Sequence, residues 1–353
     1  MDGQTDELLK SELRKVAPGT RLREALKAII AGRTGALIVI GDVAKVETIS
    51  NGGFAIDIPF TPQRLFELAK MDGAIILDAE SDRILRANVH LVPDPSLPTS
   101  ETGMRHRTAE RVSRQTRALV ISISQRREVV SLYLAGRRVT LDDIEVDLAK
   151  ANQALQTLER YRSRLDAVLS RLTSLEYEDL VTMRDVTEAV GRFELVQRVS
   201  REVARYIIVL GTEGRLIRMQ AEELTASVDD DYVLLLRDYV ADPSSRKVAV
   251  VRAKLADVPT DRLFEPDSIA PLLGVSATTL GPEDHIRSRG YRALARIPML
   301  PSTVVRRIVD RFGSLPAVLA ASVDELDDVD GVGARRARSI LNGLARIRSH
   351  ASV

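Results

Sequence analysis

The chain has 353 residues, a formal net charge of +1 and no cysteine, and 44% of its residues are hydrophobic. The lack of cysteine excludes disulfide bridges, thiolate metal sites and cysteine nucleophiles, and it favours a reducing compartment. A chain this close to neutral must bind any polyanion through local clusters of basic residues.

The first 140 residues alternate helical and strand-like patterns. Helical spacing occurs at residues 6–17 and 22–31. Apolar or alternating runs predict strands at residues 35–41, 53–61, 72–79, 83–93, 118–124 and 128–141, the last predicted as one strand. This order indicates an α/β domain with a mixed central sheet.

A helix is predicted over residues 61–71, with Thr61 as its N-cap and Pro62 at its first position. Asp72 follows directly, at what would be the negative end of the helix dipole. A carboxylate is unfavourable there, and a divalent cation would relieve the repulsion. Asp72-Gly73 is also a common turn dipeptide, which would need no cation.

The stretch "TGMRHRTAER" reads as a loop that enters a helix. It places Arg105, His106 and Arg107 in the first turn, where the dipole is positive and acidic residues are usual. A polyanion such as a triphosphate would turn this repulsion into attraction, and arginine suits forked phosphate contacts. Gly103 would allow close backbone approach, and Thr108 would donate a hydroxyl. A solvated basic helix surface remains the alternative.

Residues 141–288 have the pattern of an all-helical region. It is predicted to begin with a helix of about 35 residues, with Thr140 as N-cap and Asp143 three residues later. Further helices are predicted at residues 185–211, 222–240 and 248–258. We interpret this region mainly as a spine and packing scaffold, in which a few basic positions could also serve DNA.

The last 65 residues, 289–353, contain an internal repeat with a shift of 32 positions, which predicts a doubled helix–turn–helix unit. The second copy carries Gly331, Val332 and Gly333 before a helix that opens with Arg335, Arg336 and Arg338. Glycine backbone and a positive helix end suit phosphate contacts that ignore base identity.

This part of the chain resembles the tandem helix-hairpin-helix domain of DNA-binding and repair proteins. In the first hairpin, Met299 and Pro301 stand at the two glycine positions, so we expect that hairpin to be mainly structural. Protein contacts or packing alone are the alternative role of such hairpins.

Two motifs make a further resemblance specific. "DGAIILD" (residues 72–78) and "GMRHRTAER" (residues 103–111) are similar to the DGA and RHR motifs of the diadenylate cyclase (DAC) domain. With the helical middle and the C-terminal repeat, the whole chain resembles the bacterial family of DNA-integrity scanning diadenylate cyclases. That family condenses two ATP into cyclic di-AMP and two pyrophosphates.

The resemblance implies a role for each matching residue. Asp72 would bind Mg²⁺ or Mn²⁺ and help to activate the ribose 3′-hydroxyl, and Leu91 would contact adenine largely through its backbone. The other nucleotide-binding positions implied are Gly73, Ala74, Gly103, Met104, Arg105, His106, Arg107, Thr108, Ser124 and Gln125. Asp72 and the RHR residues would be catalytic. Met104 and Gln125 replace the Thr and Glu that are common in the family, which removes a hydroxyl and a charge.

The resemblance also implies partners. Two cyclase domains would face each other in a homo-octamer, and branched or damaged DNA at the C-terminal hairpins would inhibit the enzyme. The polar N-terminus and the lack of a long apolar run predict a cytoplasmic protein without a membrane partner. The DNA binding that the resemblance implies would make it nucleoid-associated. The alternative functions are a non-catalytic DNA-binding protein whose N-terminal domain binds ATP and, more weakly, a repair nuclease.

Overall fold

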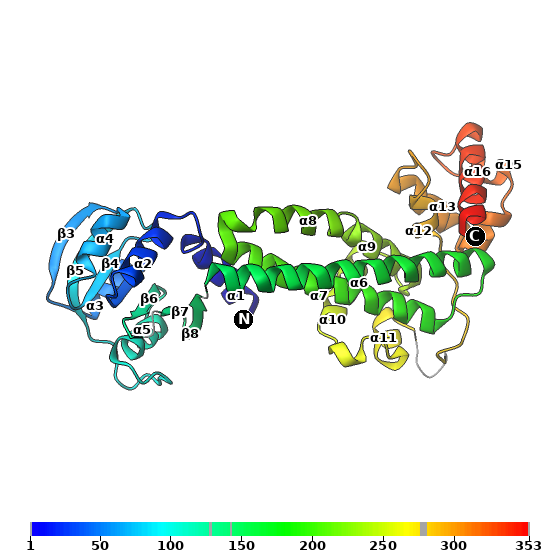
Figure 1. The fold of residues 1–353 in the computed structure, drawn as a ribbon. Helices are drawn as coiled ribbons and strands as arrows, with labels where there is room; N and C mark the ends of the chain where they lie inside the picture. Colours follow the sequence, from blue (N-terminus) through cyan, green and yellow to red (C-terminus); the bar gives the residue numbers. More distant parts are fainter. Residues whose placement is uncertain (1, 127–128, 142, 276–280, 352–353) are drawn as a thin grey trace. The chain divides into compact units, whose positions relative to one another are not determined.

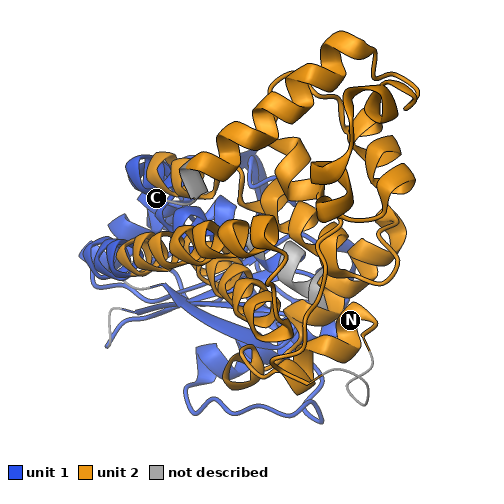
Figure 2. Ribbon diagram, turned by 90° about the vertical axis from the view of Figure 1, so that its right-hand side faces the viewer, with its two compact units in different colours: residues 1–153, 204–218 blue, residues 154–203, 219–353 orange. Residues whose placement is uncertain are grey.

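The computed structural model describes residues 2–126, 129–141, 143–275 and 281–351 (Figure 1). The chain divides into two compact units (Figure 2). Unit 1 comprises residues 1–153 and 204–218, and unit 2 comprises residues 154–203 and 219–353. The helices α6 (Ile144–Glu178), α7 (Met183–Leu210) and α8 (Arg215–Thr225) contribute residues to both units, and each unit has a core of its own.

Unit 1 is built on a mixed eight-stranded sheet of order β2-β5-β4-β1-β6-β7-β8, with β3 paired to β5. Strand β1 (Ala36–Ile40) pairs in parallel with β4 (Ala74–Leu77) and antiparallel with β6. The other strands are β2 (Ser50–Asn51), β3 (Phe54–Pro59), β5 (Arg83–Leu91), β6 (Leu119–Ser124), β7 (Val129–Leu134) and β8 (Arg137–Leu141). The mixed sheet predicted from the sequence is therefore confirmed.

Helices cover both faces of this sheet. Alternate strand residues such as Ile38 and Ile75 pack with α2 (Arg21–Ala31) and α4 (Pro62–Leu68). Their neighbours, such as Val39, pack on the opposite face with α3 (Val43–Thr48) and α5 (Met104–Gln115). Because both faces are covered, the central strands are buried along their whole length, which explains their continuous apolar runs. Unit 1 also contains α1 (Asp2–Lys15) and the short η1 (Gly211–Gly214).

Two local predictions in unit 1 are confirmed. The Thr61 hydroxyl caps α4 by accepting a hydrogen bond from the Arg64 amide at 3.2 Å, and a proline occupies the first turn. Helix α5 begins at Met104 after Gly103, and no acidic residue lies in its first turn. The basic residues of the RHR motif are therefore in the position that the sequence indicated.

Two boundary predictions are wrong. Residues 129–141 of the predicted strand form the hairpin of β7 and β8, because Ala135 and Gly136 both have positive φ, as a tight hairpin turn requires, and residue 128 lies outside the described residues. Thr140 is not an N-cap: it pairs with Ser131 inside β8, and α6 starts at Ile144. The capping pattern lies where β8 still pairs with β7, and strand pairing decides the local structure. Residue 142, which follows β8, lies outside the described residues.

Unit 2 is helical, as predicted. Helix α6 has 35 residues, the length that the pattern indicated. The predicted helix over residues 222–240 is two helices, because three aspartates in the first turn of α9 favour a new helix start. Beyond α6 and α7 the helices are α8 (Arg215–Thr225), α9 (Val228–Tyr239), α10 (Ser245–Ala256), η2 (Thr260–Arg262), α11 (Pro266–Leu273), α12 (Tyr291–Ala295), α13 (Ser302–Phe312), α14 (Leu315–Ala320), α15 (Val323–Asp327) and α16 (Ala334–Ala351). Among the described residues, none of these helices combines the length and hydropathy needed to cross a bilayer.

The last helices repeat in space as well as in sequence. Helices α12 and α15 start at Tyr291 and Val323, and α13 and α16 start at Ser302 and Ala334, so both pairs differ by the shift of the repeat. Met299 and Gly331, also related by this shift, both have positive φ. Equivalent apolar residues of the two copies share one core, among them Leu294, Ile308, Leu326 and Ile340.

A buried polar network joins the repeat to the rest of unit 2. The Asp238 carboxylate on α9 accepts hydrogen bonds from the amides of Gly290, Tyr291 and Arg292 at 2.8, 2.7 and 3.0 Å. Helix α12 has only five residues, so most of its amides need such an external acceptor. The buried Arg292 guanidinium in turn donates to Glu176 on α6 at 2.8 Å.

Candidate functional site

Four neighbouring strands bring the N-terminal motif residues to the same end of the strands, and we call this end of the sheet the site edge. Gly35 and Gly73 precede the parallel strands β1 and β4, so they lie at the same end. Strand β6 runs antiparallel to β1 and ends there at Ser124, and β5 runs antiparallel to β4 and ends there at Leu91. The sheet topology thus gathers residues that are up to 89 positions apart.

Asp72 and Arg105 meet at the site edge. The Arg105 Nη2 atom lies 3.6 Å from the Asp72 Oδ1 atom, with the carboxylate side chain fully exposed. Helix α4 ends at Leu68, so Asp72 is not in its last turn, and the helix-dipole argument for a cation at Asp72 is wrong because the dipole acts within one turn. An exposed ion pair at this distance contributes little to stability, so a structural role does not account for the pairing of Asp72 with Arg105.

Gly35 also belongs to this site, although the sequence analysis did not find it. A Cβ atom on Gly35 would lie 2.1 Å from Nη1 and 3.1 Å from Cζ of Arg105. The guanidinium therefore lies directly on the backbone at the start of β1, in space that any other residue would occupy. The available signal was a glycine immediately before a buried strand, which is too common to be specific.

Gly73 has φ of +93°, and a Cβ there would lie 2.8 Å from the carbonyl carbon of Asn88. Only glycine combines this backbone conformation with such close approach to β5. The side chain of Ala74 is buried in the core. Any contact of these two residues with a nucleotide would therefore be made by their backbone.

His106 takes part in a chain of hydrogen bonds. Its Nδ1 atom lies 3.0 Å from the Tyr133 hydroxyl, which donates to Glu101 Oε1 at 2.9 Å. Arg138 donates to the same oxygen at 2.9 Å. Burial and the hydrogen bond to Glu101 raise the pKa of Tyr133 far above its ordinary value, so the phenol keeps its proton. His106 is thus hydrogen-bonded to a buried tyrosine, whereas its neighbour Arg105 lies beside the exposed Asp72.

The loop of residues 92–103 is fastened to α5 by a buried carboxylate. Glu110 accepts hydrogen bonds from the Thr99 hydroxyl at 2.7 Å and the Ser100 amide at 3.1 Å. Arg114 donates to its other oxygen at 2.8 Å. Burial alone would raise the pKa of Glu110, but these donors hold the pKa below its ordinary value. The loop therefore has a defined attachment next to the first turn of α5.

The remaining predicted nucleotide residues fall into three groups. Leu91 is buried at the end of β5, and Thr108 and Ser124 are half-buried. Gly103, Met104, Arg107 and Gln125 are exposed. The structure therefore brings the predicted set to the site edge and the adjoining N-terminus of α5, with Arg105 and Asp72 in direct proximity.

The predicted DNA-binding residues lie together at the start of α16. Gly331 has φ of +90°, Val332 is buried, and Gly333 is exposed directly before the helix. The Arg336 guanidinium donates to the Gly331 carbonyl, so it fixes the turn. Arg335 and Arg338 are exposed. This second candidate site lies wholly in unit 2.

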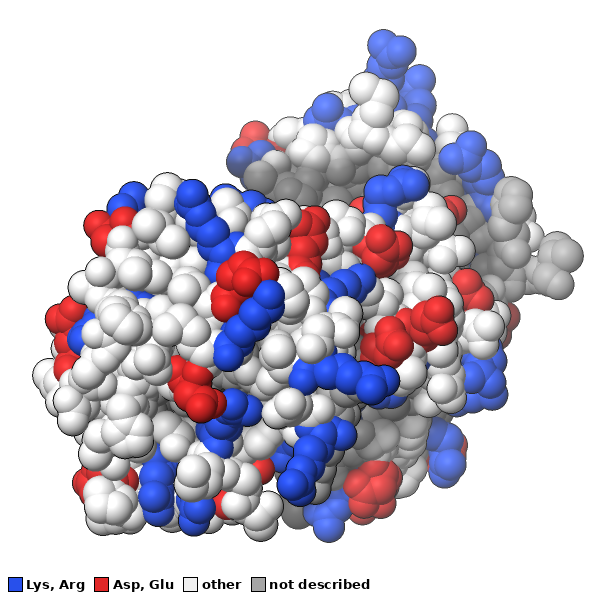
Figure 3. Space-filling model, turned by 60° about the vertical axis from the view of Figure 1, so that its left-hand side comes forward, with Lys and Arg blue, Asp and Glu red and all other residues white. Residues whose placement is uncertain are grey.

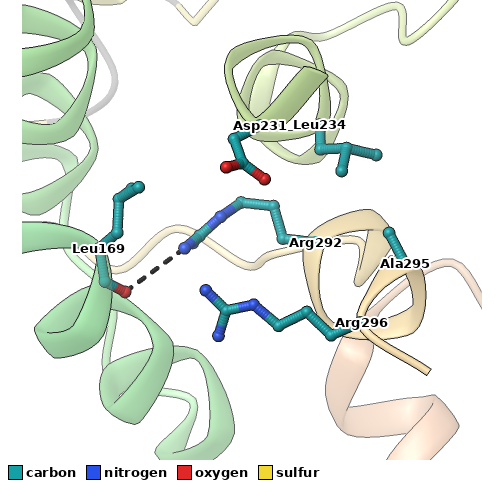
Figure 4. A pocket seen from close by; sticks show the side chains of 6 residues that line it. All are labelled: Leu169, Asp231, Leu234, Arg292, Ala295 and Arg296. Atoms are coloured by element: carbon teal, nitrogen blue, oxygen red, sulfur yellow. Dashed lines mark hydrogen bonds between the residues drawn. The ribbon is translucent and has the colours of Figure 1, made fainter. Parts of the chain in front are cut away.

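A cavity of about 80 Å³ in unit 2 is a structural feature rather than a third site. Arg292 and Arg296 point into it, and Arg292 reaches the Leu169 carbonyl (Figure 4). Both guanidinium groups are hydrogen-bonded to protein atoms, Arg292 to Glu176 and Arg296 to the Thr173 hydroxyl.

On the face seen in Figure 3, basic and acidic side chains are interspersed, so local clusters of charge matter more there than a broad electrostatic field of one sign.

The site edge offers few side chains that could bind a metal. No group of three His, Asp or Glu that could hold a metal occurs among the residues that the structure describes. Asp72 offers a single, fully exposed carboxylate. This set fits an ion such as Mg²⁺, which proteins often bind with one or two carboxylates while substrate phosphates and water complete the shell. It does not fit a metal held by protein atoms alone.

The chain is similar to known proteins over nearly its whole length. Residues 23–138 match the family model of the DisA bacterial checkpoint controller nucleotide-binding domain (DAC), and residues 141–280 match that of the DisA linker region. The chain is 52% identical to the DNA integrity scanning protein DisA of Symbiobacterium thermophilum, over 95% of both chains. It is 48% identical to DisA of Carboxydothermus hydrogenoformans over 97% of both chains, and 46% identical to DisA of Streptomyces coelicolor over 97% of this chain and 92% of that one.

Proposed function

The chain belongs to the DNA integrity scanning protein DisA family and is a diadenylate cyclase, and from this premise we propose that unit 1 joins two molecules of ATP into cyclic di-AMP. The observation that carries the proposal is the meeting of Asp72 and Arg105 at the site edge. An exposed carboxylate beside a guanidinium, next to a helix start without acidic residues, complements a metal-bound triphosphate.

In this proposal the phosphates lie against the first turn of α5. Arg105 and Arg107 supply positive charge, Thr108 supplies a hydroxyl, and the amides of the first turn supply further donors. Arg105 is already placed by its contacts with Gly35 and Asp72, and groups placed before the substrate binds favour the charge that develops during transfer. Met104 and Gln125 offer neither a hydroxyl nor a charge, so we expect the remaining donors to carry the phosphate contacts.

Asp72 would hold a Mg²⁺ or Mn²⁺ ion that arrives with ATP. When bound, such an ion neutralises phosphate charge and polarises the phosphoryl group. Asp72 itself would lie next to the ribose 3′-hydroxyl of the nucleotide. The resemblance assigns it a part in activating that hydroxyl, and the exposure of its side chain supports access by substrate.

The reaction needs two nucleotides that face each other. Each ribose 3′-hydroxyl would give up its proton to water, with Asp72 beside it, as its oxygen forms a bond to the α-phosphorus of the opposite ATP. The bond from that phosphorus to the bridging oxygen breaks, and pyrophosphate leaves with the electron pair. One cyclase domain would hold one ATP, so two domains must meet, and an isolated protomer would be inactive. We propose a homo-octamer in which cyclase domains (residues 1–140) pair and the helical region (residues 141–288) forms the spine.

We further propose that residues 289–353 are a tandem helix-hairpin-helix domain that binds branched or damaged DNA and thereby inhibits the cyclase. The turn at Gly331 supports this assignment, because its left-handed backbone leads directly into α16. A Cβ on Gly333 would meet no atom closer than 4.0 Å, so the glycine leaves room for a phosphate backbone. Arg335 and Arg338 add positive charge beside that room.

The cyclase proposal is tested by incubating the full chain with ATP and Mg²⁺ or Mn²⁺ and measuring cyclic di-AMP by mass spectrometry. Asp72→Asn should lower the rate by about a hundred-fold or more, because the charge beside the reacting groups is lost. Asp82→Asn is the matched control: it removes another exposed carboxylate of unit 1, paired with Arg21 at 2.6 Å, and should leave the rate unchanged. A fully active Asp72→Asn protein would show that the site lies elsewhere.

A further inference from the structure

Tyr133 is hydrogen-bonded to the RHR motif, and the proposed reaction gives it no role. It lies on β7 and is fully buried, yet its hydroxyl reaches His106 on α5 and Glu101 on the loop before α5. A phenylalanine would fill the same space in the core. Core packing therefore does not account for the hydroxyl group of Tyr133.

The hydrogen positions in the series of hydrogen bonds from His106 through Tyr133 to Glu101 can be assigned from the number of donors that each group has. Glu101 Oε1 accepts from both Tyr133 and Arg138, as an ionised carboxylate does. The single hydroxyl hydrogen of Tyr133 is thus directed to Glu101. Toward His106 the phenol oxygen can only accept, so the hydrogen between them belongs to His106 Nδ1. A neutral imidazole with hydrogen on Nδ1 has its lone pair on Nε2.

The opposite edge of the ring lies toward the start of α5. A Cβ atom on Gly103, the N-cap of α5, would lie 3.5 Å from His106 Cδ2, the carbon bonded to Nε2. Gly103 is exposed, and its missing side chain leaves that edge of the imidazole uncovered by the N-cap. The ring therefore has one nitrogen held by the core, and the other on the edge nearest the place where the proposed function puts the triphosphate.

We propose that Tyr133 is a positioning residue for the cyclase reaction: held by Glu101, its hydroxyl keeps the His106 hydrogen on Nδ1 and presents Nε2 to the nucleotide. This inference rests on the proposed function for the identity of the ligand, but the hydrogen assignment stands on the geometry alone. His106 would then meet the nucleotide through Nε2 only, whereas Arg105 and Arg107 bind as fixed cations. Glu101 couples the same hydroxyl to the loop of residues 92–103.

The hydrogen assignment can be read by solid-state nuclear magnetic resonance of the full chain labelled with [¹⁵N]histidine. The sequence has four histidines, so His106→Asn identifies the signal of interest. At about pH 8.5, where an ordinary imidazole is neutral, wild-type His106 should carry hydrogen on Nδ1. Tyr133→Phe should shift it to the commoner Nε2–H form, and kcat/KM for ATP should fall about ten-fold, as for one lost hydrogen bond.

Glu101→Ala provides a second test that leaves the core intact. Without its acceptor, Tyr133 can donate to His106 Nδ1 instead, so the hydrogen should again move to Nε2. Tyr232→Phe is the matched control, because it removes another buried hydroxyl that donates to a carboxylate, Glu194 at 2.6 Å, with no histidine involved. This control should leave both the His106 signal and kcat/KM unchanged.

The outcomes separate the two proposals. A His106 signal that stays in the Nδ1–H form in both Tyr133→Phe and Glu101→Ala would overturn the positioning role. A changed signal with unchanged kcat/KM would overturn it as well, since the hydrogen would then not matter to catalysis. If the wild-type chain made no cyclic di-AMP, the proposed function would fail, and the resonance data would still support or contradict the geometry around His106.

Discussion

At the scale of single residues, the site edge depends on close approach as much as on charge. The Arg105 guanidinium reaches Asp72 because the backbone of Gly35 leaves the space in which it lies. A new Cβ at position 35 would meet the flexible end of Arg105, which can move at small cost in folding energy, and the Ile123 carbonyl oxygen at 3.2 Å, a contact that a shift of a few tenths of an ångström relieves. The consequence of filling the space should therefore appear in function rather than in stability.

We expect Gly35→Ala to lower cyclase activity by about ten-fold to a hundred-fold, because the new Cβ would displace a phosphate-binding guanidinium from its position. Thermal unfolding should change little. Gly281→Ala is the matched control, since a Cβ there would meet no atom closer than 3.6 Å. Steady-state rates and melting curves of both variants check this. Full activity in Gly35→Ala would mean that Arg105 does not need its observed place.

Sequence reasoning found the residues of the motifs more reliably than the causes of their placement. The basic residues at the start of α5 were found from their unfavourable position on a helix, and that position is observed. Asp72 was selected by the same argument, but α4 ends at Leu68 and the argument fails there. Gly35 and Tyr133 were missed because their importance arises only from contacts between the sheet and α5 or the loop before it.

At the scale of elements, α5 carries both the basic first turn and the anchor for the preceding loop. Glu110 is buried about one turn after the RHR residues and fixes the loop through Thr99 and Ser100. The same loop carries Glu101, which bonds Tyr133. A change that frees the loop should therefore disturb His106 without touching it.

Glu110→Ala should free this loop. We expect hydrogen exchange in residues 92–103 to become at least about ten-fold faster, and unfolding to cost about 1–3 kcal/mol less, because several donors lose a buried acceptor. Mass-spectrometric hydrogen exchange measures the first effect, and chemical denaturation measures the second. Glu145→Ala, on the exposed first turn of α6, is the control and should change neither quantity. Unchanged exchange in Glu110→Ala would contradict the anchoring role.

The same carboxylate predicts a direction with pH. The pKa of Glu110 is held below its ordinary value, so its contribution to stability is present above the unfolded pKa of about 4.3 and is lost as pH falls further. The difference in melting temperature between wild type and Glu110→Ala should be full at neutral pH and shrink below about pH 4. A difference that grew on acidification would show the opposite shift.

Element types followed from the sequence where the pattern was long, and boundaries failed where two local signals competed. The buried strands and the long helix α6 were predicted from continuous patterns. The turn at Ala135 and Gly136 lacks the usual Asn-Gly signal, so the hairpin of β7 and β8 was predicted as one strand. At Thr140 a capping pattern lay inside a strand, and pairing with β7 decided the outcome.

At the scale of the whole molecule, the C-terminal repeat is attached to unit 2 by buried charge. Removing residues 289–353 would take away Arg292 and leave the carboxylates of Glu176 and Asp238 in the interior without their cation. Breaking a buried pair by removing one partner is strongly destabilising, by about 3–5 kcal/mol. A deletion would thus confuse loss of DNA binding with loss of folding, and surface substitutions in the full chain are the better test.

The double substitution Arg335→Gln and Arg338→Gln should weaken binding to a four-way DNA junction and lower its salt dependence. Each lost phosphate contact removes about one unit from the slope of log K against log salt, so the slope should fall by about two. Arg336 is kept because it bonds to the Gly331 carbonyl and fixes the turn. Cyclase activity without DNA should be unchanged, while more DNA should be needed to inhibit it.

The matched control is Arg246→Gln with Lys247→Gln. These residues remove the same charge from the exposed first turn of α10, another helix of unit 2, which has serine instead of glycine before it. If both double variants lowered the slope equally, DNA would be responding to the net charge of unit 2 and not to the turn before α16. A loss confined to the Arg335 and Arg338 variant would support phosphate binding at the start of α16, where a Cβ on Gly333 would meet no atom closer than 4.0 Å beside these basic side chains.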